Sequence, residues 1–108
     1  MISQMSFNKY QLNAHETAIY PEENALPYLS LGLAAEAGEV ADKVAKYYRG
    51  DKDLDLDELA KELGDVLWFV SELAFVTGYP LAQIALQNLS KLNGRSARGV
   101  LKGNGDNR

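Results

Sequence analysis

Two pairs of carboxylates stand out, because the members of each pair are three residues apart: Glu36 with Glu39, and Glu62 with Asp65. Residues at this spacing are neighbours on one surface of a helix. If the two helices pack face to face, the four carboxylates converge, and carboxylates held together out of water repel one another or take up protons. A divalent cation relieves that repulsion, and all-oxygen ligands favour Mg²⁺, Mn²⁺ or Ca²⁺ over zinc or copper. The spacing therefore predicts a metal site built from these four side chains.

Both pairs fall on apolar faces, where charged side chains are unexpected. On a helix that turns by about 100° per residue, Glu36 and Glu62 each lie within the apolar stripe of their segment, while Glu39 and Asp65 lie at the stripe edges. The apolar neighbours are Leu29, Leu33, Val40 and Val44 in the first segment, and Leu59, Val66, Phe69 and Leu73 in the second. A simpler interpretation is that the acids are solvated and pair with nearby lysines. The pattern alone leaves that interpretation open.

The segments that carry these residues read as helices, without strand-like alternation of any length. Four helices are predicted, at about residues 6–20, 26–49, 57–77 and 80–93. Ser6 is a suitable first cap, and a proline or glycine marks each end: Pro21, Gly50, Gly78 and Gly94. The second and third helices would each be about 30 Å long, which suits an antiparallel pair joined by a short loop. The prediction is an all-α, four-helix bundle-like fold with a basic, glycine-rich tail over residues 95–108.

Composition narrows the class of protein. The 108 residues, 46% of them apolar, indicate a single globular domain over residues 1–108. The net charge of −4 does not favour binding to nucleic acid or to an anionic membrane surface. The absence of cysteine excludes disulfides and thiolate zinc sites. Residues 1–7 lack a secretory signal and no apolar stretch approaches the roughly 20 residues of a membrane span, so we expect a cytoplasmic protein.

The acidic pairs belong to a longer motif. Residues 31–44 read LGLAAEAGEVADKV, and Glu62-Leu-Gly-Asp65-Val-Leu-Trp68 follows. This combination resembles the MazG-like, all-α NTP pyrophosphohydrolases, whose signature is Glu-Glu-x-x-Glu on one helix and Glu-x-x-Asp on the next. The likeness covers most of the chain and extends to Thr17-Ala-x-Tyr20-Pro21 and to Asn88-x-x-Lys91-x-x-x-Arg95 with the Arg-Gly-Val-Leu after it. One residue departs from the fullest motif: Ala35 stands where its first Glu would be, so one metal site is expected and further sites are in doubt.

The resemblance implies a reaction and its cofactor. Hydrolysis of an NTP to NMP and diphosphate would depend on Mg²⁺, with Mn²⁺ as a substitute, and would serve to clean the nucleotide pool. Glu36, Glu39, Glu62 and Asp65 would hold the metal, and Glu36 or Glu39 would also orient or deprotonate the attacking water. The sequence does not distinguish these two carboxylates. It also does not indicate the preferred base or sugar.

Four side chains are expected to bind substrate: Lys43, Asn88, Lys91 and Arg95. Lys43 lies on the same helix face as Glu36, one turn past Glu39, and the resemblance favours phosphate contact by Lys91 and Arg95. Each has an ordinary alternative. Lys43 would equally suit an ion pair with Glu39, Lys91 and Arg95 would complement the dipole at the end of their helix, and Asn88 would suit a solvent-exposed position. The single histidine, His15, is expected to pack on the apolar face of the first helix rather than to catalyse.

Assembly is expected as well. Leu67, Trp68 and Val70 place apolar side chains on more than one side of the third predicted helix, which a lone small domain can hardly cover. Single-domain members of the resembled family are typically symmetric oligomers with active sites near subunit boundaries. We therefore expect a homotetramer, with a homodimer as the next choice.

Two other interpretations compete with the hydrolase. A non-catalytic helical interaction module, with its acids merely on the surface, remains the competing hypothesis. A calcium loop formed by Asp51, Asp53, Asp55 and Glu62 is disfavoured, because Leu56 occupies the position at which that motif requires glycine.

Overall fold

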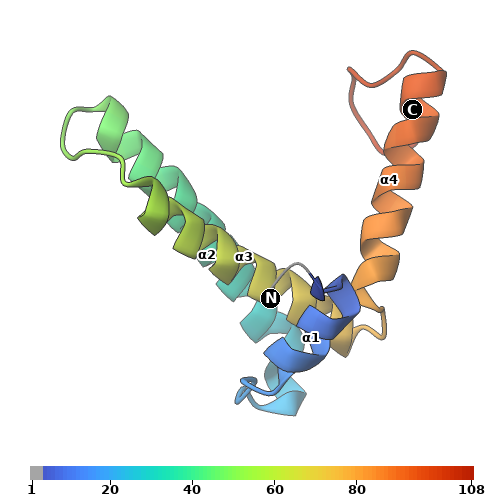
Figure 1. The fold of residues 1–108 in the computed structure, drawn as a ribbon, viewed down its shortest axis with the longest axis horizontal. Helices are drawn as coiled ribbons and strands as arrows, with labels where there is room; N and C mark the ends of the chain where they lie inside the picture. The colour runs from blue at the N-terminus through green and yellow to red at the C-terminus, as the bar shows by residue number, and fades with distance from the viewer. Residues whose placement is uncertain (1–3) are drawn as a thin grey trace.

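The computed structural model describes residues 4–108 and is all-α, as predicted (Figure 1). Its elements are α1 (Phe7–His15), the 3₁₀ turn η2 (Glu22–Asn24), α2 (Ala25–Tyr48), α3 (Leu56–Val76) and α4 (Leu81–Ala97). No strand occurs within the residues described. Residues 1–3 lie outside the described residues. They are part of the domain predicted over residues 1–108 and of the segment 1–7, for which no secretory signal is predicted.

Helix α1 begins where predicted but ends earlier. The Ser6 hydroxyl accepts a hydrogen bond from the backbone N–H of Lys9 at 3.0 Å, which confirms the expected cap. The prediction that this helix continues to residue 20 is wrong. The carbonyl of Ala14 accepts hydrogen bonds from the Thr17 hydroxyl at 2.7 Å and from the Trp68 indole at 3.3 Å. The backbone N–H of Thr17 also donates to this carbonyl at 3.0 Å, and the N–H of Ala18 donates to the His15 carbonyl at 3.0 Å. The helix therefore ends in a tight turn with i to i+3 bonds, and the chain continues towards η2.

Helices α2 and α3 form the predicted long antiparallel pair (Figure 1), and their boundaries fall within one residue of the expected ones. Gly50 ends α2 with a φ of 81°, the left-handed conformation that glycine adopts without steric cost. Asp55 caps α3, because its carboxylate accepts hydrogen bonds from the backbone N–H groups of Asp57 and Glu58. The acidic connection between α2 and α3 therefore forms the turn between the two helices, and its last residue, Asp55, caps α3.

The paired helices approach closely at Gly32. A β-carbon at this position would lie 2.2 Å from Cε1 of Phe69, so only glycine leaves room for the ring. Gly32 precedes Glu36 by one turn of α2, and Phe69 follows Asp65 by one turn of α3. The contact therefore fixes the relative height of the two helices beside the acidic residues.

Helix α4 is longer than predicted. The expectation that it ends near residue 93, at Gly94, is wrong, because Gly94 is helical and the helix continues to Ala97. The end comes where Gly99 adopts a φ of 72° and the N–H of Val100 donates to the carbonyl of Arg95 at 2.9 Å. A glycine inside a helix destabilises it by only about 1 kcal/mol, so Gly94 does not end α4. The helix ends at the glycine that adopts a left-handed backbone conformation, Gly99.

Helix α4 points away from the α2–α3 pair (Figure 1). It contacts α1 and α3 but, within the part of the chain described, not α2. The four helices of one chain therefore leave the bundle open on the side where α4 diverges. No single helix among residues 4–108 is long and apolar enough to cross a membrane; α3 and α4 meet that test of length and composition only together, as a pair bent by 102°.

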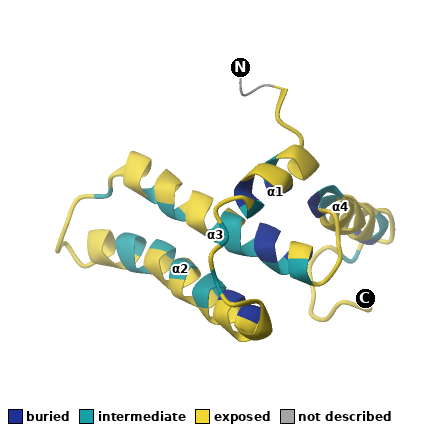
Figure 2. Ribbon diagram, turned by 90° about the horizontal axis from the view of Figure 1, so that it is seen from below, coloured by how far each residue is buried: buried dark blue, intermediate teal, exposed yellow. Residues whose placement is uncertain are grey.

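The buried centre lies where α1 crosses α3 near the starts of α2 and α4 (Figure 2). Its apolar members are Ala14, Ala25, Leu29, Ala74 and Leu81. Among the described residues four polar side chains are buried: Gln11, Ser71 and Glu72 in this centre, and Arg95 near the end of α4. Gln11 joins α1 to the start of α4, because its side chain donates to the Tyr79 carbonyl at 2.9 Å and accepts from the Leu81 N–H at 3.0 Å. The core is thus small and partly polar, and many large apolar side chains stay exposed.

Candidate metal centre between two paired helices

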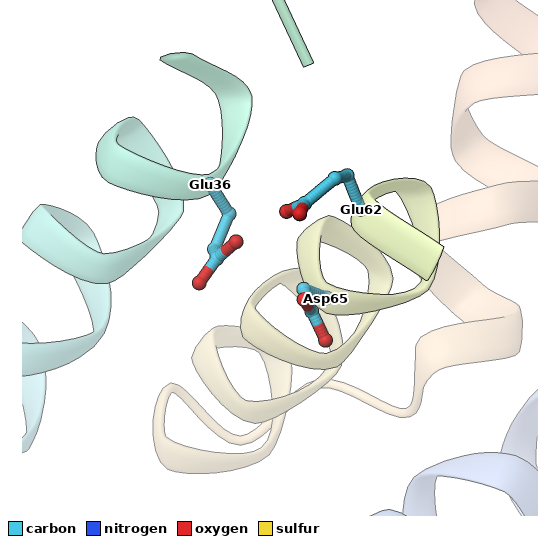
Figure 3. Close-up of side chains that lie close together, drawn as sticks. All are labelled: Glu36, Glu62 and Asp65. Carbon is cyan, nitrogen blue, oxygen red and sulfur yellow. The ribbon is translucent and has the colours of Figure 1, made fainter. Parts of the chain in front are cut away.

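Three carboxylates meet between α2 and α3. Glu36 from α2 and Glu62 and Asp65 from α3 each offer an oxygen atom, and these atoms lie within 4.8 Å of one another. The carboxylates of Glu36 and Glu62 point into the space between the helices, with Asp65 one turn further along α3 (Figure 3). Glu36 and Glu62 are partly buried and Asp65 is exposed. The predicted convergence of acids from the two helices is therefore present for three of the four residues.

Negative charge accumulates in this cluster. Partial burial raises the pKa of the Glu36 carboxyl, and the neighbouring carboxylates of Glu62, Asp65 and Glu39 raise it further. The nearest compensating charge is Lys43, whose Nζ lies 3.9 Å from Oε1 of Glu62. The single positive charge of Lys43 does not neutralise three clustered carboxylates, whereas a divalent cation would supply the missing positive charge. Because all donors are carboxylate oxygens, the site suits Mg²⁺, Mn²⁺ or Ca²⁺.

Glu39 lies outside the three-residue group. It is exposed and lines a small hollow of about 90 Å³, together with Asp42, Lys43 and Lys46. Within that hollow Lys46 pairs with Asp42 at 2.7 Å. Lys43 lies at the boundary, because it lines the hollow and also contacts Glu62 of the cluster. Its ion pair therefore joins α2 to α3, whereas the sequence had suggested a pair with Glu39 on the same helix.

The other residues expected to bind substrate lie on α4, away from the cluster. Asn88 and Lys91 are exposed on α4, and Arg95 is buried near its end. Lys91 and Arg95 each approach the same oxygen, Oδ1 of Asp106, at 3.2 Å. Arg95 therefore belongs to the helix and is not part of the predicted tail, which begins only after Ala97. One chain alone does not bring these three side chains to the acidic cluster.

A buried acid that was not predicted from the sequence, Glu72, lies at the contact of α1 with α3. It lies seven residues after Asp65 on α3, and its side chain is fully buried. Its Oε1 accepts a hydrogen bond from the Tyr20 hydroxyl at 2.6 Å and lies 2.9 Å from Nδ1 of His15. His15 also stacks on Phe75, with the ring centroids 3.7 Å apart, so it packs at the α1–α3 contact as expected. The sequence did contain a signal for this residue: Glu72 follows Asp65 by seven residues, which places both on the same face of the helix.

Comparison with known proteins identifies the segment that holds the cluster. Residues 25–100 match the MazG nucleotide pyrophosphohydrolase domain. Over 115 aligned positions the chain is 44% identical to the "Gene 37 protein" of Mycobacterium phage L5, a match that covers 96% of this chain and all of the phage protein. No solved structure matches significantly. The matched segment includes both acidic pairs and the three α4 residues, and leaves α1 and the end of the tail outside.

Proposed function

The chain belongs to the MazG nucleotide pyrophosphohydrolase family, and from this premise we propose that it converts a nucleoside triphosphate and water to a nucleoside monophosphate and diphosphate. The oxygen of water attacks the α-phosphorus, the bond from that phosphorus to the α–β bridging oxygen breaks, and the diphosphate leaves with that oxygen. The proposal rests on one observation, the convergence of Glu36, Glu62 and Asp65 on facing helices of the matched segment. Removal of unwanted nucleotides from the pool is the proposed physiological role.

We assign Glu36, Glu62 and Asp65 to holding Mg²⁺, with Mn²⁺ as a substitute. When bound, the cation supplies positive charge against the phosphate oxygens of the substrate. Glu39 is the fourth expected ligand, and its exposed position outside the group also leaves it free to orient the attacking water and take its proton. Glu36 is the alternative for that role. Since Ala35 replaces a further acid, we propose a single metal site.

Phosphate binding is assigned to Lys43 in the same chain. Its ammonium already lies 3.9 Å from Glu62, beside the place where the triphosphate would meet the cluster. Phosphoryl transfer depends mainly on positioning and charge neutralisation, so neither His15 nor a hydroxyl nucleophile is required. Asn88, Lys91 and Arg95 can join the site only from a neighbouring copy, because α4 diverges from α2.

We therefore propose a homotetramer, or failing that a homodimer, in which α4 of one subunit faces the acidic cluster of another. The support is the exposed apolar surface. Leu86 and Leu89 of α4 are 66% and 54% exposed, and Leu63 of α3 is 53% exposed. Association would cover side chains that one open bundle leaves in water.

The experiment is a product assay with canonical and damaged ribo- and deoxyribonucleoside triphosphates in the presence of Mg²⁺. The expected products are monophosphate and diphosphate in equal amounts, with no turnover after chelation of the metal. Water labelled with heavy oxygen should place the label in the monophosphate, which locates the attack at the α-phosphorus. Diphosphate nucleotide and orthophosphate would mean a different reaction. Failure to turn over any nucleotide would favour the helical interaction module.

A further inference from the structure

The tail after α4 folds back and places an acid on two of that helix's cations. Oδ1 of Asp106 lies 3.2 Å from Nζ of Lys91 and 3.2 Å from Nη2 of Arg95. The guanidinium also donates to the Gly105 carbonyl at 3.3 Å. The side chain of Arg95 is only 5% exposed, whereas that of Asp106 is 83% exposed. The buried guanidinium of Arg95 is thus paired with a carboxylate that is itself exposed to solvent.

Arg108 holds the tail in this conformation. Its guanidinium donates to three carbonyls of the loop, those of Val100 at 3.0 Å, Leu101 at 3.1 Å and Gly105 at 2.6 Å. Arg98 of the helix end donates to the Arg108 carbonyl at 2.7 Å. These bonds close a loop around Asp106, so the carboxylate is held against α4 by a defined structure.

The carboxylate satisfies the two cations incompletely. Two positive charges share one oxygen of a group with a single negative charge, and Nε of Arg95 is buried without a hydrogen-bond partner. A phosphate group offers more oxygens and up to twice the charge, and two of its oxygens can accept parallel hydrogen bonds from Nε and Nη2 on one edge of a guanidinium. The site is therefore better matched to a phosphate than to the acid that fills it.

We propose that Asp106 is an internal anion that occupies a phosphate site formed by Lys91 and Arg95, and that the terminal phosphates of the nucleotide displace it and open the tail. The part that these cations play in catalysis rests on the proposed function. The anion site itself stands on the contacts of α4 and the tail. In the free protein Asp106 competes with substrate, which makes the tail a built-in brake on phosphate binding.

The test compares the binding of sodium diphosphate to the full-length protein and its variants by calorimetry, without divalent cations. Asp106→Asn should bind diphosphate at least about threefold more tightly, the size expected when one exposed ion pair no longer competes. Arg108→Ala, which releases the loop and keeps the acid, should act in the same direction. Asp51→Asn is the matched control, because it also loses an exposed pair, that with Arg49 at 2.9 Å, in the connection between α2 and α3. This connection lies at the end of the helix pair away from α4 (Figure 1). Unchanged or weaker binding in Asp106→Asn would overturn the proposal.

Two further measurements separate this inference from the proposed reaction. Lys91→Gln in the Asp106→Asn background should cancel the gain, and persistence of the gain would place the diphosphate elsewhere and sink the proposal. With nucleoside triphosphate and Mg²⁺, Asp106→Asn should lower KM and leave kcat unchanged. If it raises KM, Asp106 positions the cations instead of competing, and the inference fails while the reaction stands. If no nucleotide is hydrolysed but diphosphate binding still tightens, the anion site stands and the proposed reaction fails.

Discussion

Nδ1 of His15 lies 2.9 Å from Oε1 of Glu72, and this oxygen also accepts the hydroxyl hydrogen of Tyr20 at 2.6 Å. The two contacts tie α1 and the segment after it to the middle of α3. Glu72 follows Asp65 by two turns on the same face. The buried acid therefore holds in place the helix that supplies two of the three clustered carboxylates.

Loss of this buried acid should destabilise the fold. Glu72→Ala removes a fully buried side chain and leaves the Tyr20 hydroxyl and the His15 ring without their acceptor, so we expect a loss of about 2–4 kcal/mol in the free energy of unfolding. Glu72→Gln should lose less, because its amide oxygen can still accept from Tyr20. Glu58→Ala, which breaks only a surface pair with Lys61, should change stability by less than about 0.5 kcal/mol. Equal effects in denaturant titrations of the Glu72→Ala and Glu58→Ala variants would contradict this role.

Stability should fall at alkaline pH because of Tyr20. Burial raises the pKa of its phenol above the ordinary 10.0, and the hydrogen bond to Glu72 and the charge of that carboxylate raise it further. Between the unfolded and folded pKa values the folded state binds more protons, so the free energy of unfolding decreases as pH rises above about 10. Tyr20→Phe should flatten this decrease and remove the last part of the tyrosinate absorbance titration. Tyr48→Phe, which removes an exposed ring, should leave that last part intact.

Neutralising Asp65 or Glu39 should impair catalysis much more than it impairs stability. Asp65→Asn and Glu39→Gln should each reduce Mg²⁺-dependent formation of monophosphate and diphosphate by about 100-fold or more, since each removes a charge that acts on the transferring phosphate or the water. The circular dichroism spectrum should not change, because Asp65 and Glu39 are exposed. Glu23→Gln, an exposed acid of η2, serves as the control with normal activity. Full activity in both site variants would place the chemistry elsewhere.

Metal binding and metal-free stability should respond oppositely to Glu36→Gln. The raised pKa of Glu36 means that its charge is unfavourable in the folded state above the ordinary value of 4.5, so removing the charge should raise the melting temperature of the metal-free protein at neutral pH. The additional stabilisation by Mg²⁺ should disappear. A thermal shift series with and without Mg²⁺ measures both effects, and a wild-type response to Mg²⁺ would remove Glu36 from the ligand set.

The protein should be an oligomer in solution. Light scattering at micromolar concentration should give a mass well above the 11.9 kDa of one chain, with four copies preferred to two. Leu89→Glu, which puts a charge on the exposed apolar face of α4, should shift the mass towards one chain and lower activity together. Gln87→Glu adds the same charge at another exposed position of α4 and should leave the assembly intact. A fully active species with the mass of one chain would rule out both the tetramer and the dimer.

Much of the fold follows from signals within a few residues of one another. Ser6 caps α1, Gly50 ends α2, and the apolar spacing locates the two long helices to within one residue. The same periodicity singled out Glu36 and Glu62 as acids on apolar faces, and the structure brings both into one cluster. These features are local because a cap or a helix face is fixed by the residues of one or two turns.

The tertiary structure decided which of these side chains meet. At the end of α1 the Ala14 carbonyl accepts a hydrogen bond from the indole of Trp68, which is 54 residues away in the sequence. The pairing of Lys43 with Glu62, the burial of Glu72 and the divergence of α4 likewise depend on how whole helices pack. Periodicity gives the face on which a residue lies but not the height or angle at which that face meets another helix. Those are set by side-chain volumes at contacts such as Gly32 with Phe69, between segments that the sequence places far apart.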